Sequence, residues 1–588
     1  MLPLEVFSQL PTAIGGSLLL SALVAALPLV LLFILLGVFK APAWISSLSA
    51  LVLCVILSIV GWQMPFGQSM SATLLGIFNG LFQIMWLLVA ALWLYNTTVK
   101  LGWDRVLRDL MRGISDDLRV LSILIAFSFG ALIEGLAGFG TPVAITAGIM
   151  AATGMPKLKA AAVCMLANTA PVAFGSVGAP ITALGTAAAA KFGDGASYAI
   201  GSVDPTVLST TFGAMIGRQS PFMAIIVPFF LLFMVDGIRG VKDCWHIALV
   251  GGVSFALVQF LASNYVSYMI TDILASLFSL LVLILFLRAV QPKNKMAAEV
   301  VQDEGELLPS QKTTGAARVW GALAPYLVIV VLFSVSKIPV IASWLSSTLT
   351  PHSVNAATGK SQAGFIWPGL ADCHGPAAAD GSVGGACVSA TVNLYSVLSS
   401  GFILAIGALI TAAIYKLAIG KSFKVLGATI VSLRYTIITI GCVLGIAYIM
   451  NASGITLSLG MALAGVGAAF VAVSPVLGWL GVALTGSDTS SNALFGSMQV
   501  AAAQGVWPGS IPHQVLAAST NSSGGVMGKM ISPQSLSVAA AAAGLLNKEG
   551  EIFRKVLPWS IVLLVIFAAL VTLQGTVLTG MIPVPPVP

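Results

Sequence analysis

Charge is scarce in this chain: only 8% of its 588 residues are Asp, Glu, Lys or Arg, and 58% are hydrophobic. Soluble domains carry about 25% charged residues, so a water-soluble globular protein is excluded. Metal-ligand spacings, phosphate-binding glycine loops and nucleophilic triads are also missing, and the four histidines are scattered. We therefore expect neither an enzyme nor a metal or organic cofactor, and any transport should be driven by an ion gradient.

The chain is rich in long apolar segments. Stretches such as TAIGGSLLLSALVAALPLVLLFILLGVF and DILASLFSLLVLILFL meet the length of roughly 20 residues that a helix needs to cross a bilayer. The short alternating segments of an outer-membrane barrel are absent, and the start, MLPLEVFSQLPT, lacks the basic region of a cleavable signal peptide. The sequence thus predicts an all-α polytopic membrane protein surrounded by lipid.

The net charge of +7 indicates topology rather than a nucleic-acid partner, because Lys and Arg collect in cytoplasmic loops. Most basic residues lie in clusters, among them 100–119, 288–318 and 548–555. Placing every cluster in the cytoplasm predicts about 12 transmembrane helices, with both termini on the external side. The predicted crossings are 12–39, 43–65, 71–99, 158–190, 206–236, 245–262, 266–290, 319–342, 396–416, 432–451, 513–543 and 557–581.

Two further apolar stretches, 118–156 and 474–512, must leave and return on the same side to preserve this order. Each is long enough for a re-entrant helical hairpin, the first entering from the cytoplasm and the second from outside. Each also precedes one copy of an internal repeat, ANTAPVAFGSVGAPIT and TNSSGGVMGKMISPQS, in which Asn168 aligns with Asn521. We interpret the copies as broken helices at 158–190 and 513–543, since inverted repeats with broken helices at the midplane are a transporter architecture.

The repeat divides the chain into three parts. Residues 1–240 form the first inverted repeat, 241–318 a helix pair and a cytoplasmic linker, and 319–588 the second inverted repeat. The hydrophilic stretch 349–392 is expected to be a solvated external loop. Its two cysteines, Cys373 and Cys387, could pair in an oxidising compartment.

Four stretches at membrane depth carry helix breakers or capping residues: EGLAGFGTP, NTAPVAFGSVGAP, TGSDTSSN and STNSSGG. Irregular backbone in the hydrocarbon core belongs inside protein or along a cavity, and the N-terminus of a broken helix attracts anions. Together the four stretches would form a site for a small carboxylate. Alternatively, Gly and Ser only allow tight helix packing, which leaves the neighbouring Asn, Asp and Glu unexplained. The expected hairpin and hinge positions are Gly135, Gly138, Gly140, Pro142 and Gly486.

Two acids occupy the predicted hairpin tips, and intramembrane ionisable residues are costly and usually functional. Glu134 has only apolar and glycine neighbours in the sequence, so burial should favour its protonated form near neutral pH. Asp488 has hydroxyl neighbours that could stabilise its charge or else coordinate a cation. Both acids could instead serve a structural ion pair.

Two basic residues are also predicted at membrane depth. Arg218 offers a planar fork for a carboxylate, although it could simply neutralise Glu134 or Asp488. Lys529 lies beside the second broken helix and could snorkel to the interface. Asp236 and Asp272 lie close to predicted helix ends and are expected to be interfacial.

The motifs FGALIEGLAGFGTPVAIT, NTAPVAFGSVGAPI, GRQSPFM, GWLGVALTGSDTSSNALFGSMQ and GVMGKMISPQS resemble the signature stretches of the bacterial lactate permeases. The resemblance covers nearly the whole chain except the two hydrophilic insertions. It implies a proton-coupled symporter of L-lactate, and also of D-lactate and glycolate, in the inner (plasma) membrane, driven by the proton gradient alone. The hairpins and broken helices also resemble the wider ion-transporter superfamily, whose members move a transport domain against a dimeric scaffold, so we expect a monomer or homodimer.

A 2-hydroxymonocarboxylate needs a positive partner for its carboxylate and polar side chains for its hydroxyl. Glu134 and Asp488 are the expected proton-coupling residues, with Glu134 as the carrier. The other expected substrate-binding residues are Asn168, Thr169, Arg218, Thr485, Ser487, Thr489, Ser490, Asn521, Ser522 and Lys529.

Other classes of protein remain open at this point. A Na⁺-coupled symporter of another organic acid or dicarboxylate would use Asp488 and the surrounding hydroxyls as its cation site. A passive channel for small acids would not accumulate substrate above equilibrium. A membrane enzyme would release a changed product.

Overall fold

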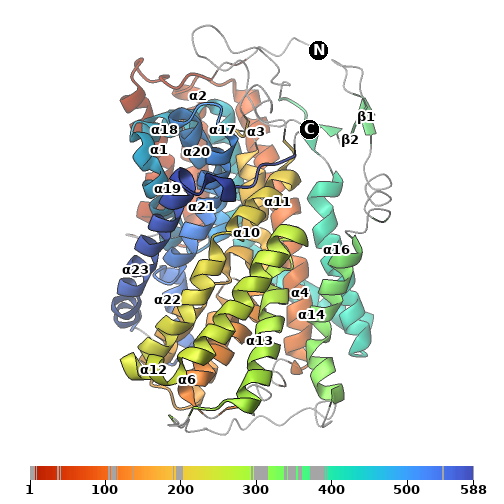
Figure 1. Ribbon diagram of the computed structural model, residues 1–588. Coiled ribbons are helices and arrows are strands. Elements are labelled where there is room, and N and C mark those ends of the chain that lie inside the picture. The colour runs from red at the N-terminus through yellow and green to blue at the C-terminus, as the bar shows by residue number, and fades with distance from the viewer. Residues whose placement is uncertain are drawn as a thin grey trace.

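The computed structural model describes residues 7, 9–35, 39, 41–103, 106, 114–115, 117–136, 138, 140–189, 191–193, 203–292, 296, 316–336, 341, 352–354, 361–363, 365–370, 391–392, 394–545 and 548–586. Figure 1 shows helices packed side by side in a bundle. The helices of the first half are α1 (Leu18–Phe33), α2 (Ala43–Val60), α3 (Phe66–Asn79), η2 (Gly80–Met85), α4 (Trp86–Lys100), α6 (Leu118–Leu121), η3 (Ser122–Phe129), α7 (Gly130–Leu136), α8 (Thr141–Ala152), α9 (Lys157–Ala167), η4 (Val172–Phe174), α10 (Gly175–Ala188), α11 (Pro205–Ile216), α12 (Ser220–Tyr265) and α13 (Thr271–Ala289).

The second half is also helical, with one exception in the predicted external loop. Four strands of two or three residues lie between residues 352 and 392, so the prediction of an all-α chain holds for the apolar part and not for this loop. Cys373 and Cys387 lie outside the described residues. The elements are α14 (Ala316–Ser336), β1 (His352–Val354), β2 (Ser361–Ala363), β3 (Phe365–Ile366), β4 (Thr391–Val392), α16 (Leu394–Ile414), α17 (Ile419–Ser453), α18 (Ile455–Ala464), η6 (Gly467–Ala469), α19 (Phe470–Thr485), α20 (Asp488–Val506), α21 (Ile511–Lys529), α22 (Pro533–Ala542), α23 (Glu549–Thr576) and η7 (Thr579–Met581).

Several helices are long and apolar enough to cross a membrane. Among the described residues there are five by length and composition, or up to seven if each of two bent pairs counts as one span. One of the five, α12, has 46 residues and would be about 69 Å long if straight. It is broken at Asp236 and Gly237, and a Cβ on Gly252 would lie 3.0 Å from the carbonyl oxygen of Ala224. α12 is therefore two antiparallel arms, and the total of about 12 crossings stays a prediction.

The first helical hairpin is formed by α6, η3 and α7 on one side and α8 on the other. Its arms contact each other along η3 and α7. The turn between them contains Gly138 (φ 51°) and Gly140 (φ 83°), a backbone conformation that glycine adopts without a steric penalty. Pro142 follows in the first turn of α8, where its missing N–H costs nothing.

The second hairpin is formed by α19 and α20, and its turn is shorter. Gly486 ends α19 in the left-handed conformation (φ 72°). Ser487 then caps α20, since its hydroxyl accepts a hydrogen bond from the backbone N–H of Ser490. The Gly-Ser pair in TGSDTSSN thus explains why one helix stops and the next begins within two residues.

The first broken helix is bent by 63° between α9 and the segment that starts at Val172. Beyond the bend, Ser176 (φ 48°) and Val177 (φ 56°) have left-handed backbone angles, followed by Gly178 (φ 73°). A β-branched residue in this region is a genuine outlier and costs about 1–3 kcal/mol. Such strain persists where surrounding packing enforces it, and this turn lies in the buried centre of the protein.

The second broken helix differs from the prediction. The stretch STNSSGG (519–525) was expected to be irregular, yet it lies inside the continuous helix α21, which ends only at Lys529. Its glycines instead permit close packing against α19. A Cβ on Gly524 would lie 2.6 Å from the carbonyl oxygen of Pro475, and one on Gly528 would lie 2.2 Å from that of Trp479. The packing interpretation is therefore correct for these glycines.

Hydrogen bonds join the ends of elements that are distant in sequence. Figure 1 shows α6 at the opposite end of the bundle from β1 and β2. Contacts between termini predicted to be external are Gln9 to Asn451, Ser71 to Pro368 and Gln504 to Lys191. Contacts between termini predicted to be cytoplasmic are Met296 to Asp117, Lys159 to Val235 and Tyr415 to Gly321.

Candidate substrate and proton site

The tips of the two hairpins meet at a buried pocket of about 290 Å³. The first hairpin contributes Glu134 to its wall, and the second contributes Gly486 and Ser487. The strained turn of α10 supplies Ser176, so backbone breaks of three elements converge here. The remaining lining residues are Val172, Gly175, Pro180, Asp488, Thr489 and Lys529.

An ion pair between the two halves of the chain crosses this pocket. Lys529 Nζ lies 2.9 Å from Glu134 Oε1, and the two side chains are 9% and 2% exposed. Two sequence interpretations are therefore wrong: Glu134 is not surrounded only by apolar groups and glycine, and Lys529 does not snorkel. Glu134 Oε2 has no partner in the described part of the chain.

Glycine makes room for the Glu134 carboxyl group. A Cβ on Gly175 would lie 2.6 Å from Glu134 Oε1, and one on Gly138 would lie 3.5 Å from the same atom. Gly135 serves a different contact, because its Cβ position is 3.4 Å from Asp272 Cβ. Gly140 faces Val538 of α22.

Asp488, at the start of α20, is held by donors from two helices. Its Oδ2 accepts hydrogen bonds from Ser522 Oγ at 2.6 Å and from Asn492 Nδ2 at 3.3 Å. Its Oδ1 is buried without a hydrogen-bond partner among the described residues. Ser522 is therefore a direct partner of this acid, rather than a free hydroxyl facing the pocket.

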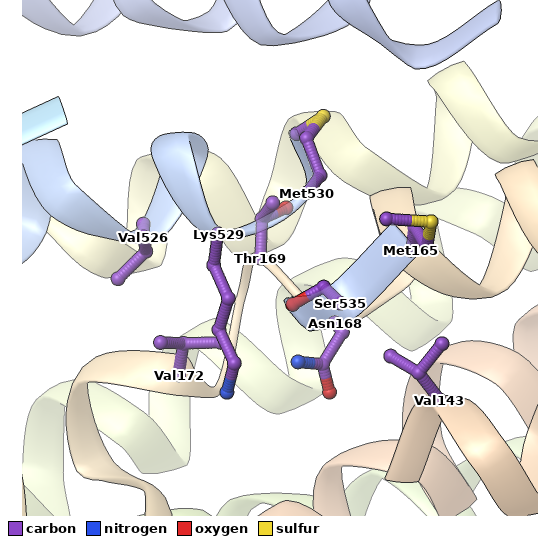
Figure 2. Close-up of a pocket in the computed structure, with 9 residues that line it drawn as sticks. All are labelled: Val143, Met165, Asn168, Thr169, Val172, Val526, Lys529, Met530 and Ser535. Atoms are coloured by element: carbon purple, nitrogen blue, oxygen red, sulfur yellow. The ribbon is translucent and has the colours of Figure 1, made fainter. Parts of the chain in front are cut away.

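A second pocket of about 180 Å³ is also lined by Lys529. Figure 2 shows the Lys529 ammonium and the Asn168 amide extending toward the same side of it. Asn168 Oδ1 has no partner in the described structure, whereas Thr169 Oγ1 donates back to the carbonyl oxygen of Leu166 at 2.6 Å. The rest of the wall is mostly apolar and consists of Val143, Met165, Val172, Val526, Met530 and Ser535.

Other predicted substrate ligands are used inside the protein. Asn521 Nδ2 donates to Asn492 Oδ1 at 2.9 Å, and its Oδ1 accepts from Gln499. Thr485 Oγ1 donates to the Gly481 carbonyl oxygen at 2.7 Å. Together with the cap that Ser487 provides for Ser490, these hydrogen bonds stabilise the second hairpin. Among the hydroxyl residues of this hairpin that were predicted to bind substrate, Ser487 and Thr489 line the first pocket.

Arg218 lies away from both pockets. Its Nε donates to Asn264 Oδ1 at 2.9 Å and its Nη1 to the Met581 carbonyl oxygen at 2.6 Å. It therefore pairs with neither Glu134 nor Asp488. The sequence interpretation expected Arg218 beside the substrate, whereas the basic residue that lines both pockets is Lys529.

Sequence reasoning missed three residues near these pockets. Ser176 was not selected because nothing in GSVG marks which residue faces a cavity. Asn492 lay within TGSDTSSN, and its position four residues after Asp488 on a helix could have identified it. Asp272 was assigned to the interface, but it is only 1% exposed; Asp236, by contrast, is partly exposed and pairs with Arg119 at 3.1 Å.

Sequence comparison now adds to this geometry. A family model described as L-lactate permease matches residues 21–578. The chain belongs to the L-lactate permease family. The glycolate permease GlcA of Escherichia coli K12 is 38% identical over 583 residues, which cover 96% of this chain and 98% of that protein. The L-lactate permease of Bacillus subtilis is 37% identical over 587 residues, covering 98% of this chain and all of the relative.

Membership of the L-lactate permease family confirms the resemblance read from the motifs. It also confirms a multi-pass membrane transporter rather than an enzyme, because the relatives are named permeases. Among solved structures, the YdaH transporter of Alcanivorax borkumensis matches with a TM-score of 0.40 and 14% identity, over 87% of this chain and 89% of that one.

Proposed function

We propose that this permease carries L-lactate, with D-lactate and glycolate as further substrates, together with a proton across the bacterial inner membrane. The observation that carries the proposal is the buried pair of Lys529 and Glu134 at the meeting point of the hairpin tips. Relatives named for lactate and glycolate support a short 2-hydroxymonocarboxylate as substrate. Asp488 shapes the same pocket from the second hairpin.

Coupling follows from competition for Lys529. A substrate carboxylate that binds Lys529 Nζ leaves Glu134 as a buried carboxylate without a counter-charge, which is strongly unfavourable. Glu134 then takes a proton, which removes this uncompensated charge. The loaded site has the same net charge as the empty one, so the anion avoids a cost of about 2.3 kcal/mol per 100 mV of inside-negative potential.

The second pocket suits the rest of the substrate. The unpartnered Asn168 Oδ1 is an acceptor for the 2-hydroxyl group, and a buried acceptor gains more from a partner than an exposed one. Val143, Val172 and Val526 offer an apolar wall for the methyl group of lactate. Glycolate lacks this methyl group and would leave the wall uncovered.

The topology proposed with this function has about 12 crossings in two inverted repeats and both termini outside. Hydrogen bonds that join chain segments predicted to share a side support it, on both faces of the bundle. The two hairpins then enter from opposite sides and meet at one pocket, an arrangement that suits alternating access.

The experiment is lactate uptake into proteoliposomes containing the purified permease. With a pH gradient of one unit, acid outside, one-to-one symport should accumulate L-lactate about tenfold, whether or not valinomycin and K⁺ set the membrane potential to zero. D-lactate and glycolate should compete. Uptake that follows a Na⁺ gradient and ignores pH would reject proton coupling, and uptake that stops at equilibrium would indicate a channel.

The role of Glu134 has a separate test. Glu134→Gln should abolish pH-driven accumulation while lactate exchange remains, since the amide cannot take up a proton. Glu551→Gln is the matched control, because Glu551 is 47% exposed and pairs with Lys548 on the surface. Unchanged accumulation by the Glu134 variant would remove this residue from the coupling mechanism.

A further inference from the structure

A third buried acid lies next to the hairpin tip, in a place that the coupling cycle above does not use. Asp272 is in the first turn of α13 and is 1% exposed. A Cβ on Gly135, the residue after Glu134, would lie 3.4 Å from Asp272 Cβ and 3.3 Å from the Ile273 backbone nitrogen. The absence of a side chain at Gly135 therefore lets α7 pack directly against the start of α13, where an added Cβ would be tight.

The Asp272 carboxyl group is poorly satisfied. Its Oδ1 accepts one long hydrogen bond, 3.4 Å from Gln259 Nε2, and the same amide group also lies 3.3 Å from the Ala170 carbonyl oxygen. Its Oδ2 has no hydrogen-bond partner within the described structure. Asp488, in contrast, receives two donors on one oxygen.

Two opposing effects make such a group able to take and release a proton. An ionised carboxylate with an unpartnered oxygen is costly in a buried, apolar place, so the acid form is favoured at rest. The free backbone N–H groups and the dipole at the start of the 19-residue helix α13 favour the ionised form. The charged residue that acts on Asp272 in the described structure is Glu134 of α7, while α12 presents the neutral Gln259.

We propose that Asp272 is a second proton-binding carboxyl group, which supplies the proton to Glu134 when the substrate takes Lys529. The inference rests on the proton-coupled function proposed above. In this step the O–H bond of the Asp272 acid breaks and a new O–H bond forms on Glu134, so Asp272 becomes the carboxylate. Asp272 then regains a proton from the external solution, because α13 starts at the end of the predicted crossing 266–290 that faces outside.

The net charge of the site is the same before substrate binds and after Asp272 has regained its proton. Before substrate binds, the site holds Lys529 as a cation, Glu134 as an anion and Asp272 as a neutral acid. After binding and reloading of Asp272, the cation faces the substrate anion and both acids are neutral. One proton has therefore entered for each anion.

The test uses Asp272→Asn in proteoliposomes, compared with the wild-type permease. Because the amide keeps the shape of the acid and cannot carry a proton, accumulation under a one-unit pH gradient should fall from about tenfold to about equal concentrations. Counterflow of labelled lactate at equal pH should remain within about threefold of wild type, since 0.65 kcal/mol corresponds to that ratio. Asp204→Asn is the matched control, because Asp204 is a helix-capping acid at the start of α11 and should retain accumulation.

Three results would overturn the inference. Wild-type accumulation by Asp272→Asn shows that the residue carries no coupling proton, and the proposed function then stands without it. Loss of both accumulation and counterflow in a folded variant shows a structural role. If Asp272→Asn does not fold, Asp272→Glu should accumulate lactate with a shifted pH profile, and an unshifted profile overturns the inference. Only a wild-type protein that ignores the pH gradient contradicts the proposed function itself.

Discussion

At the residue scale, Lys529 and Glu134 depend on each other because both charged groups are buried. Removing one member of a buried pair leaves an uncompensated charge, which costs about 3–5 kcal/mol, whereas removing both can be nearly neutral. The pair is thus stable in the empty site, and an anion that binds Lys529 replaces Glu134 only when Glu134 is neutralised at the same time. This is the property that a coupling site needs.

A double-mutant cycle tests that description. Lys529→Met should lower the unfolding free energy by about 3–5 kcal/mol, and adding Glu134→Gln should restore much of the loss. Thermal unfolding of the purified protein measures both effects. Lys548→Met, which breaks an exposed pair, should cost less than about 1 kcal/mol, and strict additivity of the two buried substitutions would contradict a direct pair.

Neighbouring serines on α21 provide a second test at this scale. Ser522 Oγ donates to Asp488 Oδ2, while Ser523 Oγ is buried with no partner in the described residues. Ser522→Ala should cost about 1.5–3 kcal/mol if Asp488 is ionised, and Ser523→Ala should be neutral or stabilising. Melting temperatures of the two variants decide this, and equal losses would mean that the Ser522 bond adds nothing specific.

At the element scale, α19 and α21 approach so closely that a Cβ added at Gly524 or Gly528 would overlap the backbone of α19. Small residues at such interfaces let helix backbones meet, which supplies much of the packing energy within a membrane. α21 stays helical past Asn521 up to Lys529 because α19 packs against these glycines, and this places Lys529 beside Glu134. The packing of these two helices therefore positions the ion pair.

Alanine substitutions at two helical glycines separate packing from helix propensity. Gly524→Ala should destabilise by about 1–3 kcal/mol through overpacking, because the new Cβ would lie 2.6 Å from a Pro475 backbone oxygen. Gly427→Ala is the control in α17, where nothing lies within 4 Å of the added Cβ, and it should be stabilising by up to about 1 kcal/mol. If thermal unfolding shows the same change for both, close approach of α19 and α21 is not the cause.

At the scale of the whole molecule, the chain has few charges and many long helices. The basic clusters therefore determine its orientation in the membrane. The proposed orientation places the segment after α23 outside and the segment before it in the cytoplasm.

Cysteine labelling in intact cells tests this orientation. In a background with the six native cysteines replaced, a membrane-impermeant maleimide should label Thr579→Cys directly. It should label Lys548→Cys only after the membrane is permeabilised, because the basic segment stays inside. Both positions are exposed in the structure. The reverse pattern would reject the proposed sidedness while leaving the site intact.

The sequence by itself determined the membrane class, the family, and the local breaks at Gly138, Gly140 and Gly486. These depend on composition, long motifs and turn chemistry, which are properties of neighbouring residues. It also selected Glu134 and Asp488, because charge is conspicuous in an apolar chain.

Only the tertiary structure decided which polar groups meet. Lys529 and Glu134 are 395 residues apart, and no local pattern distinguishes Lys529 from a snorkelling lysine or Arg218 from a ligand. Asp272 is buried because the loop before α13 and the missing side chain of Gly135 let α13 pack against α7. The stretch STNSSGG stays helical because α19 packs against it. Each of these outcomes depends on which helices share an interface, and helix periodicity and turn residues carry no information about that choice.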